Sequence, residues 1–222
     1  MEKYFSILQL THIVFGSIGF LCGYLALFSK KGSYLHKKSG IIFVFSMVFS
    51  VLLSILITLI PKHENQFLVL IGCITIYFVF SGLRALQFKT KPVSLLDKIM
   101  SCSLFFVGLF MCMQAVIRVI SSQKLNVLYL FFGVWCLLLS WADYRFYKQS
   151  KLNFLTQHIS RMMGGLIAAT TAFIVAGLHL SQLVFWIFPS LIGTYIIRYN
   201  IKKYSTPNIS TTWPPSNLFH KK

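Results

Sequence analysis

Acidic side chains are scarce in this chain, which has only four Asp and Glu residues among 222. Charged residues of both signs make up 11% of the sequence, whereas soluble domains carry about 25%. With 56% hydrophobic residues and a mean hydropathy of +0.73, this shortage excludes an ordinary soluble domain and predicts a membrane protein. No acidic residue lies in the middle of a predicted membrane span, which disfavours a pump that relays protons through the bilayer.

Motifs typical of several chemistries are also missing. None of the five cysteines belongs to a C-x-x-C pair, and all lie in apolar runs, so we interpret them as small hydrophobic residues. The absence of an H-x3-H pair disfavours a zinc hydrolase, which would need His36, Asp143 and His158 to meet. The net charge of +17 lies in short clusters without a DNA-binding motif, which argues against nucleic acid. The sequence favours a protein without enzymatic activity and assigns no catalytic residue.

Seven apolar runs are each long enough to cross a bilayer, which takes about 20 helical residues. They cover residues 5–28, 40–60, 66–86, 98–121, 125–143, 158–178 and 181–200. Only "GLHLSQL" separates the last two runs, and we predict a hairpin there because one helix through both would be far too long. The first run exceeds a signal-peptide core, so we interpret it as a spanning helix. The prediction is an all-α bundle over residues 1–204 and a flexible tail over 205–222.

The basic residues predict how this bundle is oriented. Seventeen of the 21 fall on one side of the predicted spans, namely Lys30, Lys31, Lys37, Lys38, Arg84, Lys89, Lys91, Lys98, Arg145, Lys148, Lys151, Arg161, Arg198, Lys202, Lys203, Lys221 and Lys222. The other side holds four, which are Lys3, Lys62, Arg118 and Lys124. Because Lys and Arg are enriched in cytoplasmic connections, the pattern predicts an external N-terminus, a cytoplasmic C-terminus and seven crossings.

Two predicted helices carry ionisable residues in line with small ones. His12 shares about 80° of one helical face with Gly16, Gly19, Gly23 and Ala26. A second stripe contains His158, Arg161, Gly165, Ala168, Ala172, Ala176 and His179. Because small residues mark close helix contacts in membranes, we expect both stripes to face the bundle, with the first and sixth spans as partners.

Polar residues gather at the predicted cytoplasmic face. We expect a small-molecule pocket there, lined by His36, Arg84, Asp143, His158 and Arg161. We expect Asp143 to form an ion pair with Arg84, Arg145 or Arg161. An unpaired charge near the bilayer is costly, and many basic partners are available. Arginines bind carboxylate or phosphate groups well, so the pocket predicts a small anionic ligand.

Two other functions stay open at this point. Paired histidines hold haem b across helix bundles, and His36/His158 and His12/His179 could form two such pairs in an electron carrier. Alternatively, the helices serve mainly as contact surfaces, in a structural or assembly role with a membrane-protein partner or a second copy.

Several of these motifs together resemble a known family. The pieces are His12-x3-Gly16-x6-Gly23, "KGSYLHKKSG", Asp143 with Arg145, and "HISRMMGGLIAATTAF". The chain resembles, over nearly its whole length, bacterial polytopic membrane proteins grouped as a domain of unknown function. The resemblance implies a multi-pass protein of the bacterial inner membrane. It implies no activity, but it directs attention to His12, His36, His158 and Arg161.

Overall fold

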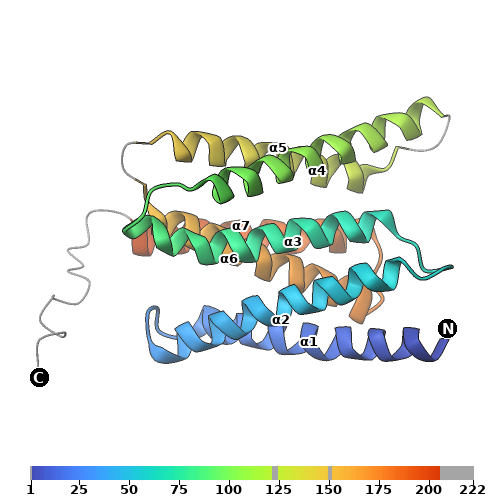
Figure 1. Ribbon diagram of the computed structural model, residues 1–222, viewed down its shortest axis with the longest axis horizontal. Coiled ribbons are helices and arrows are strands. Elements are labelled where there is room, and N and C mark those ends of the chain that lie inside the picture. Colours follow the sequence, from blue (N-terminus) through green and yellow to red (C-terminus); the bar gives the residue numbers. More distant parts are fainter. Residues whose placement is uncertain (1, 122–124, 150–151, 206–222) are drawn as a thin grey trace, which may run out of the picture.

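The structure is a computed structural model that describes residues 2–121, 125–149 and 152–205. These residues form α-helices joined by short connections (Figure 1). The α-helices are α1 (Glu2–Phe28), α2 (Tyr34–Thr58), α3 (Gln66–Arg84), α4 (Leu95–Ile120), α5 (Val127–Tyr147), α6 (Phe154–Ala172) and α7 (Leu183–Ser205). A 3-10 segment, η1 (Ala85–Lys89), continues α3, and a π-helical segment, η2 (Phe173–Gly177), continues α6.

The all-α prediction is confirmed, and six helices are long and apolar enough to cross a membrane. These six are α1 to α6, with α3 and α6 extended by η1 and η2, and α7 is not among them. The predicted hairpin between the last two runs is confirmed, since η2 ends at Gly177 and α7 begins at Leu183. Apart from Ser205, the predicted tail lies outside the described residues.

Polar capping residues explain why several helices begin before their apolar runs. Ser33, Asn65, Ser94, Asn126 and Asn153 each precede a helix, and each side chain accepts a hydrogen bond from a backbone N–H three residues later. Such a cap satisfies one of the free N–H groups at a helix start. The run predicted from residue 40 therefore begins as α2 at Tyr34, and the run predicted from 158 begins as α6 at Phe154.

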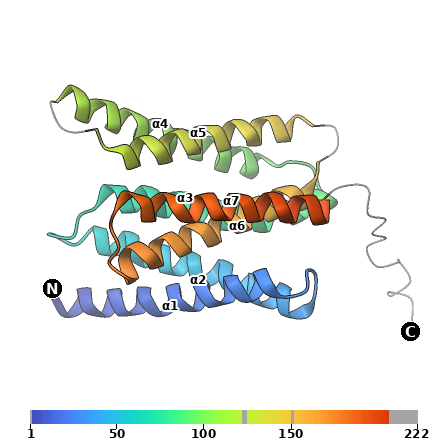
Figure 2. The same cartoon turned by 180° about the vertical axis from the view of Figure 1, so that it is seen from behind.

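The helices pack in antiparallel pairs around two apolar cores. α1 packs on α2 and α4 on α5, while α3 and α6 lie together in the middle (Figure 1). One core joins α3 to the α4–α5 hairpin, and the other joins α2, α3 and α6. α7 packs on α6 and runs along the bundle (Figure 2).

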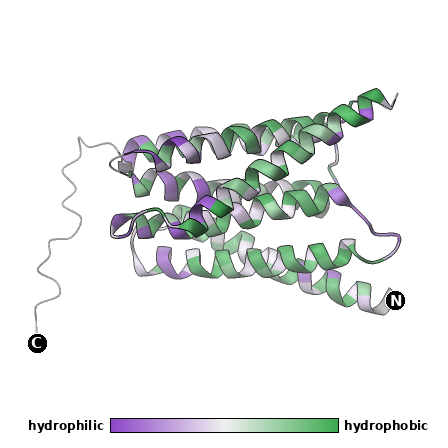
Figure 3. Ribbon diagram, turned by 45° about the horizontal axis from the view of Figure 1, so that its top comes forward, coloured by the Kyte–Doolittle hydropathy of each residue, from purple (hydrophilic) through white to green (hydrophobic). Residues whose placement is uncertain are grey.

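Most basic residues lie at one end of the bundle, which we call the basic end. It contains the connections from α1 to α2 and from α3 to α4, the start of α6 and the end of α7 (Figure 1). The side-chain amide of Asn153 donates a hydrogen bond to the carbonyl of Ser205 at 3.3 Å, which joins the start of α6 to the end of α7. Hydrophilic residues concentrate here, and hydrophobic ones cover the middle (Figure 3).

The small-residue stripes meet different partners from those predicted. Gly16 and Gly19 face Ser50 and Met47 of α2, and only Gly23 also reaches α6. Gly165 of the α6 stripe faces α3, because a Cβ there would lie 2.9 Å from Val79, and Phe43 of α2 lies next nearest at 3.4 Å. α1 does touch α6, but α2 is its main neighbour.

The closest backbone approach described at a glycine lies within the α4–α5 hairpin and yields a test of packing. A Cβ on Gly108 would lie 2.9 Å from the Gly133 carbonyl oxygen, whereas a Cβ on Gly40 would meet nothing within 4 Å. We expect Gly108→Ala to lower the free energy of unfolding by about 1–3 kcal/mol, because backbone cannot easily move aside. Gly40→Ala is the control and should preserve or raise stability. Thermal unfolding in detergent measures both, and equal midpoints would contradict this account of the hairpin.

Candidate functional site

Asp143 of α5 is fully buried and accepts hydrogen bonds from two other helices. The Tyr77 hydroxyl donates from α3. From α6, the Gln157 amide donates at 2.6 Å and the Arg161 guanidinium forms an ion pair. The prediction that Asp143 pairs with one of three arginines is thus confirmed, and Arg161 is the partner.

Arg161 is enclosed by the same group of side chains. Its side chain is only 4% exposed, and its guanidinium carbon lies 5.3 Å from the centre of the Tyr77 ring, in a cation–π contact. Tyr77 and Gln157 are also buried. A charge pair in a low-dielectric interior is stable only when such donors and acceptors surround it. The group therefore joins α3, α5 and α6 internally.

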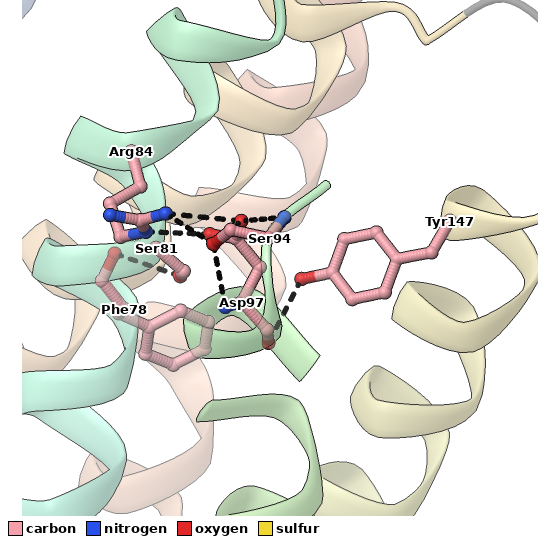
Figure 4. Close-up of polar contacts among 6 residues, drawn as sticks. All are labelled: Phe78, Ser81, Arg84, Ser94, Asp97 and Tyr147. Carbon is pink, nitrogen blue, oxygen red and sulfur yellow. Dashed lines mark hydrogen bonds and ion pairs between the residues drawn. The ribbon is translucent and has the colours of Figure 1, made fainter. Parts of the chain in front are cut away.

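Arg84 does not reach Asp143 but binds Asp97 at the start of α4 (Figure 4). Its Nε and Nη2 atoms donate to the two Asp97 carboxylate oxygens at 2.6 and 3.1 Å, and Nη2 also donates to Ser94 at 2.8 Å. The sequence analysis did not assign Asp97 a role. The sequence "SLLD", residues 94–97, could have indicated a role for Asp97, because Ser94 and Asp97 form a capping box at the start of α4.

His36 and His158 each bind a backbone carbonyl at the end of a neighbouring helix. His36 Nδ1 donates to Ala26 of α1 at 2.9 Å, and His158 Nδ1 donates to Gly82 of α3 at 2.8 Å. Because a carbonyl only accepts, these bonds put a proton on each Nδ1. The last carbonyls of a helix lack backbone partners within the helix, and the imidazoles donate to carbonyls of this kind. The Ala26 carbonyl also accepts from Ser29 and Lys31.

Two lysines accompany these histidines at the basic end. His158 lies within electrostatic range of His36 and Lys31, and Lys31 lies within range of Lys203 of α7. The Lys31 ammonium donates to the carbonyls of Ala26, at 3.3 Å, and Leu27. Partial burial, and secondly the charge of Lys203, lower the pKa of Lys31 from its ordinary value. We call Lys31, His36, His158 and Lys203 the basic cluster.

The basic cluster contains two of the five residues predicted to line a pocket. His36 and His158 lie within electrostatic range of each other, whereas Arg84, Asp143 and Arg161 are held in separate ion pairs. The sequence analysis counted Lys31 and Lys203 only for orientation. No sequence pattern indicates that Lys31 of the α1–α2 connection and Lys203 of α7 lie within electrostatic range of each other.

The remaining histidines of the sequence-based hypothesis lie elsewhere. His12 Nδ1 donates to the Ser50 carbonyl at 2.8 Å, and the Ser50 hydroxyl donates to the His12 carbonyl, so this pair joins α1 to α2. His179 is exposed in the α6–α7 connection, with a φ of 55°. Within the described ranges, no group of three or more His, Cys, Asp or Glu residues could hold a metal ion.

Comparison with protein-family models, with curated proteins and with solved structures gives no match. The family resemblance of the motifs therefore stays a prediction, and the functional argument rests on the geometry of this chain.

The buried Asp143–Arg161 pair predicts an unequal response to mutation. Asp143→Ala leaves a buried guanidinium without its counter-charge and should cost about 3–5 kcal/mol of stability. The double variant Asp143→Ala with Arg161→Met removes both charges and should recover much of this loss. Denaturation in detergent measures both. A double variant no more stable than Asp143→Ala would show that the charge pair is not the main contribution.

Proposed function

We propose that the protein crosses the inner membrane seven times, with its N-terminus outside and its C-terminus in the cytoplasm. The proposal is supported by α7, whose 23 residues extend about 34 Å at 1.5 Å per residue. It is further supported by the hydrogen bond from Asn153 to Ser205, because it joins the end of α7 to the basic end. Clustered Lys and Arg mark cytoplasmic connections, so the basic end faces the cytoplasm.

Labelling with a membrane-impermeant maleimide tests this topology. The five native cysteines lie within the candidate spans. Single cysteines introduced outside these spans can therefore be distinguished from the native ones by their reaction with the reagent. In intact cells, Lys62→Cys and His179→Cys should react, while Lys91→Cys and Tyr204→Cys should react only after permeabilisation. Reaction of both His179→Cys and Tyr204→Cys in intact cells would show that α7 does not cross, and the inverse pattern throughout would reverse the orientation.

The function that the geometry supports best is binding of a small anionic ligand by the basic cluster, at the cytoplasmic face. The observation that carries it is that the nearby acidic residues are already paired within the protein. Asp97 and Asp143 are the acids near the basic end, and both are occupied by arginines. Lys31 and Lys203 lie within electrostatic range of each other, and in the described part of the chain neither forms an ion pair with an acidic residue. An anion from outside the chain would relieve this repulsion.

This site differs from the pocket expected from the sequence. Arg84 uses Nε and Nη2 on Asp97, and Arg161 is buried beside Asp143, so neither presents at the surface the open fork with which arginine binds an external anion. The ligand donors are instead the ammonium groups of Lys31 and Lys203, contributed by the α1–α2 connection and α7.

Thermal unfolding with small anions tests the binding function. We expect anions to raise the unfolding midpoint of the full-length protein in detergent, because a ligand at 100 times its Kd stabilises by about 2.7 kcal/mol. Lys203→Gln should weaken the response because it removes one ammonium group of the cluster, while Lys148→Gln, an exposed change at the same end, should not. An equal response of both variants at matched ionic strength would exclude the cluster as the site.

Haem b is a second candidate, favoured by one observation. Histidine ligands of metals commonly donate their other ring N–H to a carbonyl, as His36 and His158 both do through Nδ1. This arrangement leaves each Nε2 for axial ligation. An absorption spectrum of the same preparation distinguishes the candidates. A Soret band that shifts on reduction and is lost in His36→Ala and His158→Ala supports haem, and a colourless preparation excludes it. If neither anion nor haem binds, the structural or assembly role follows.

A further inference from the structure

We propose that Arg118 and an apolar groove on α4 bind one anionic phospholipid, with its phosphodiester on the guanidinium and an acyl chain in the groove. α4 begins at the basic end with Leu95, and Arg118 lies close to its last residue, Ile120, at the opposite end of the bundle (Figure 1). Lipid binding here therefore goes beyond the function proposed for the basic cluster and does not depend on it.

The guanidinium of Arg118 is positioned by an aromatic ring. Its central carbon lies 5.6 Å from the centre of the Tyr129 ring of α5. Tyr129 is buried, and the Phe67 ring of α3 packs against it with the ring centres 5.1 Å apart. A guanidinium over an aromatic face can still donate from its edge, so this packing leaves Arg118 able to bind an oxyanion.

Arg118 also has an unused hydrogen-bond donor. Its Nε atom is buried and makes no hydrogen bond. In the part of the chain that the structure describes, Arg118 forms no ion pair with a carboxylate. A buried charged donor without a partner is costly, and two oxygens of a phosphate match the fork of an arginine. An oxyanion from outside the chain would therefore satisfy this group.

An apolar groove of about 460 Å³ lies along the middle of the same helix. Its lining is entirely apolar and consists of Leu70 of α3 and, from α4, Phe106, Val107, Leu109, Phe110 and Met113. Met113 is five residues before Arg118, which is about 7.5 Å along the helix. At about 100° per residue, Val107 and Arg118 lie within roughly 20° of each other around the helix. The groove therefore leads toward the guanidinium.

The two features together fit an anionic phospholipid. The middle of a spanning helix faces acyl chains, and its ends lie at the depth of the headgroups. Phe106, Leu109 and Met113 are exposed, so the groove is open to the surrounding lipid. One guanidinium balances the single negative charge of a phosphodiester. Phosphatidylglycerol offers that charge uncompensated, whereas the amine of phosphatidylcholine already neutralises it.

Native mass spectrometry of the full-length protein from mixed micelles tests the polar contact. Arg118→Gln removes the guanidinium, and Lys62→Gln removes an exposed charge at the same end. We expect Arg118→Gln to retain phosphatidylglycerol on the order of tenfold more weakly than wild type, because a charged hydrogen bond is lost. Lys62→Gln and Lys203→Gln should retain it as wild type does. Equal losses in Arg118→Gln and Lys62→Gln would show non-specific charge attraction and overturn the site.

A second pair of variants tests the groove. Met113→Trp fills it from its exposed rim, and Leu138→Trp places the same ring at an exposed position of α5 outside it. Retention of phosphatidylglycerol should fall in Met113→Trp and stay unchanged in Leu138→Trp. Both changes lie at the surface, so Met113→Trp keeps the test available if Arg118→Gln does not fold. Equal retention by Met113→Trp and Leu138→Trp would overturn the assignment of the acyl chain.

Dimethyl phosphate, a soluble phosphodiester without acyl chains, distinguishes the source of the headgroup. If it raises the thermal unfolding midpoint of wild type but not of Arg118→Gln, and no lipid is retained, the ligand is soluble and the lipid assignment is overturned. If wild type retains phosphatidylcholine as well as phosphatidylglycerol, the role of the uncompensated charge is overturned. None of these results bears on the basic cluster, whose own test uses Lys203→Gln.

Discussion

The buried carboxylate of Asp143 is the strongest constraint on this bundle. A charge removed from water is tolerated only if partners surround it, and those partners come from α3 and α6. Tyr77, Gln157 and Arg161 must therefore lie at the same depth as Asp143, which fixes how far the three helices slide against each other. The apolar core between α3 and the α4–α5 hairpin cannot do this alone, because apolar contacts tolerate a shift more readily than a charge pair does.

The pairing of Asp97 and Asp143 with arginines of the same chain determines the electrostatics of the whole basic end. Arg161 neutralises Asp143 inside the bundle, and Arg84 neutralises Asp97 at the start of α4. The lysines of the connections are left to face groups outside the protein, which in a bilayer include anionic headgroups. Most of them are exposed. Lys31 differs because it is half-buried and packs over the end of α1.

The helices were predictable from the sequence, whereas their partners were largely not. The apolar runs predicted the all-α bundle and the α6–α7 hairpin. The scarcity of acidic residues predicted that Asp143 pairs with an arginine, with Arg161 as one of three candidates. Periodicity showed that Gly16, Gly19 and Gly23 share a face, but it carries no information on which helix lies opposite. The Arg84–Asp97 pair was missed because the fourth run was predicted only from residue 98, and Lys31 and Lys203 of the basic cluster were missed because they are 172 positions apart.

His36 and His158 show how one contact can both join two helices and fix the orientation of a side chain. Each imidazole satisfies a carbonyl at the end of a neighbouring helix, which ties α2 to α1 and α6 to α3. The same bond assigns the proton to Nδ1 and fixes the orientation of the ring, so Nε2 is held in one direction without any ligand. A ligand meeting two imidazoles already oriented loses less conformational freedom than one that must order them. Loss of either histidine therefore removes a hydrogen bond between two helices.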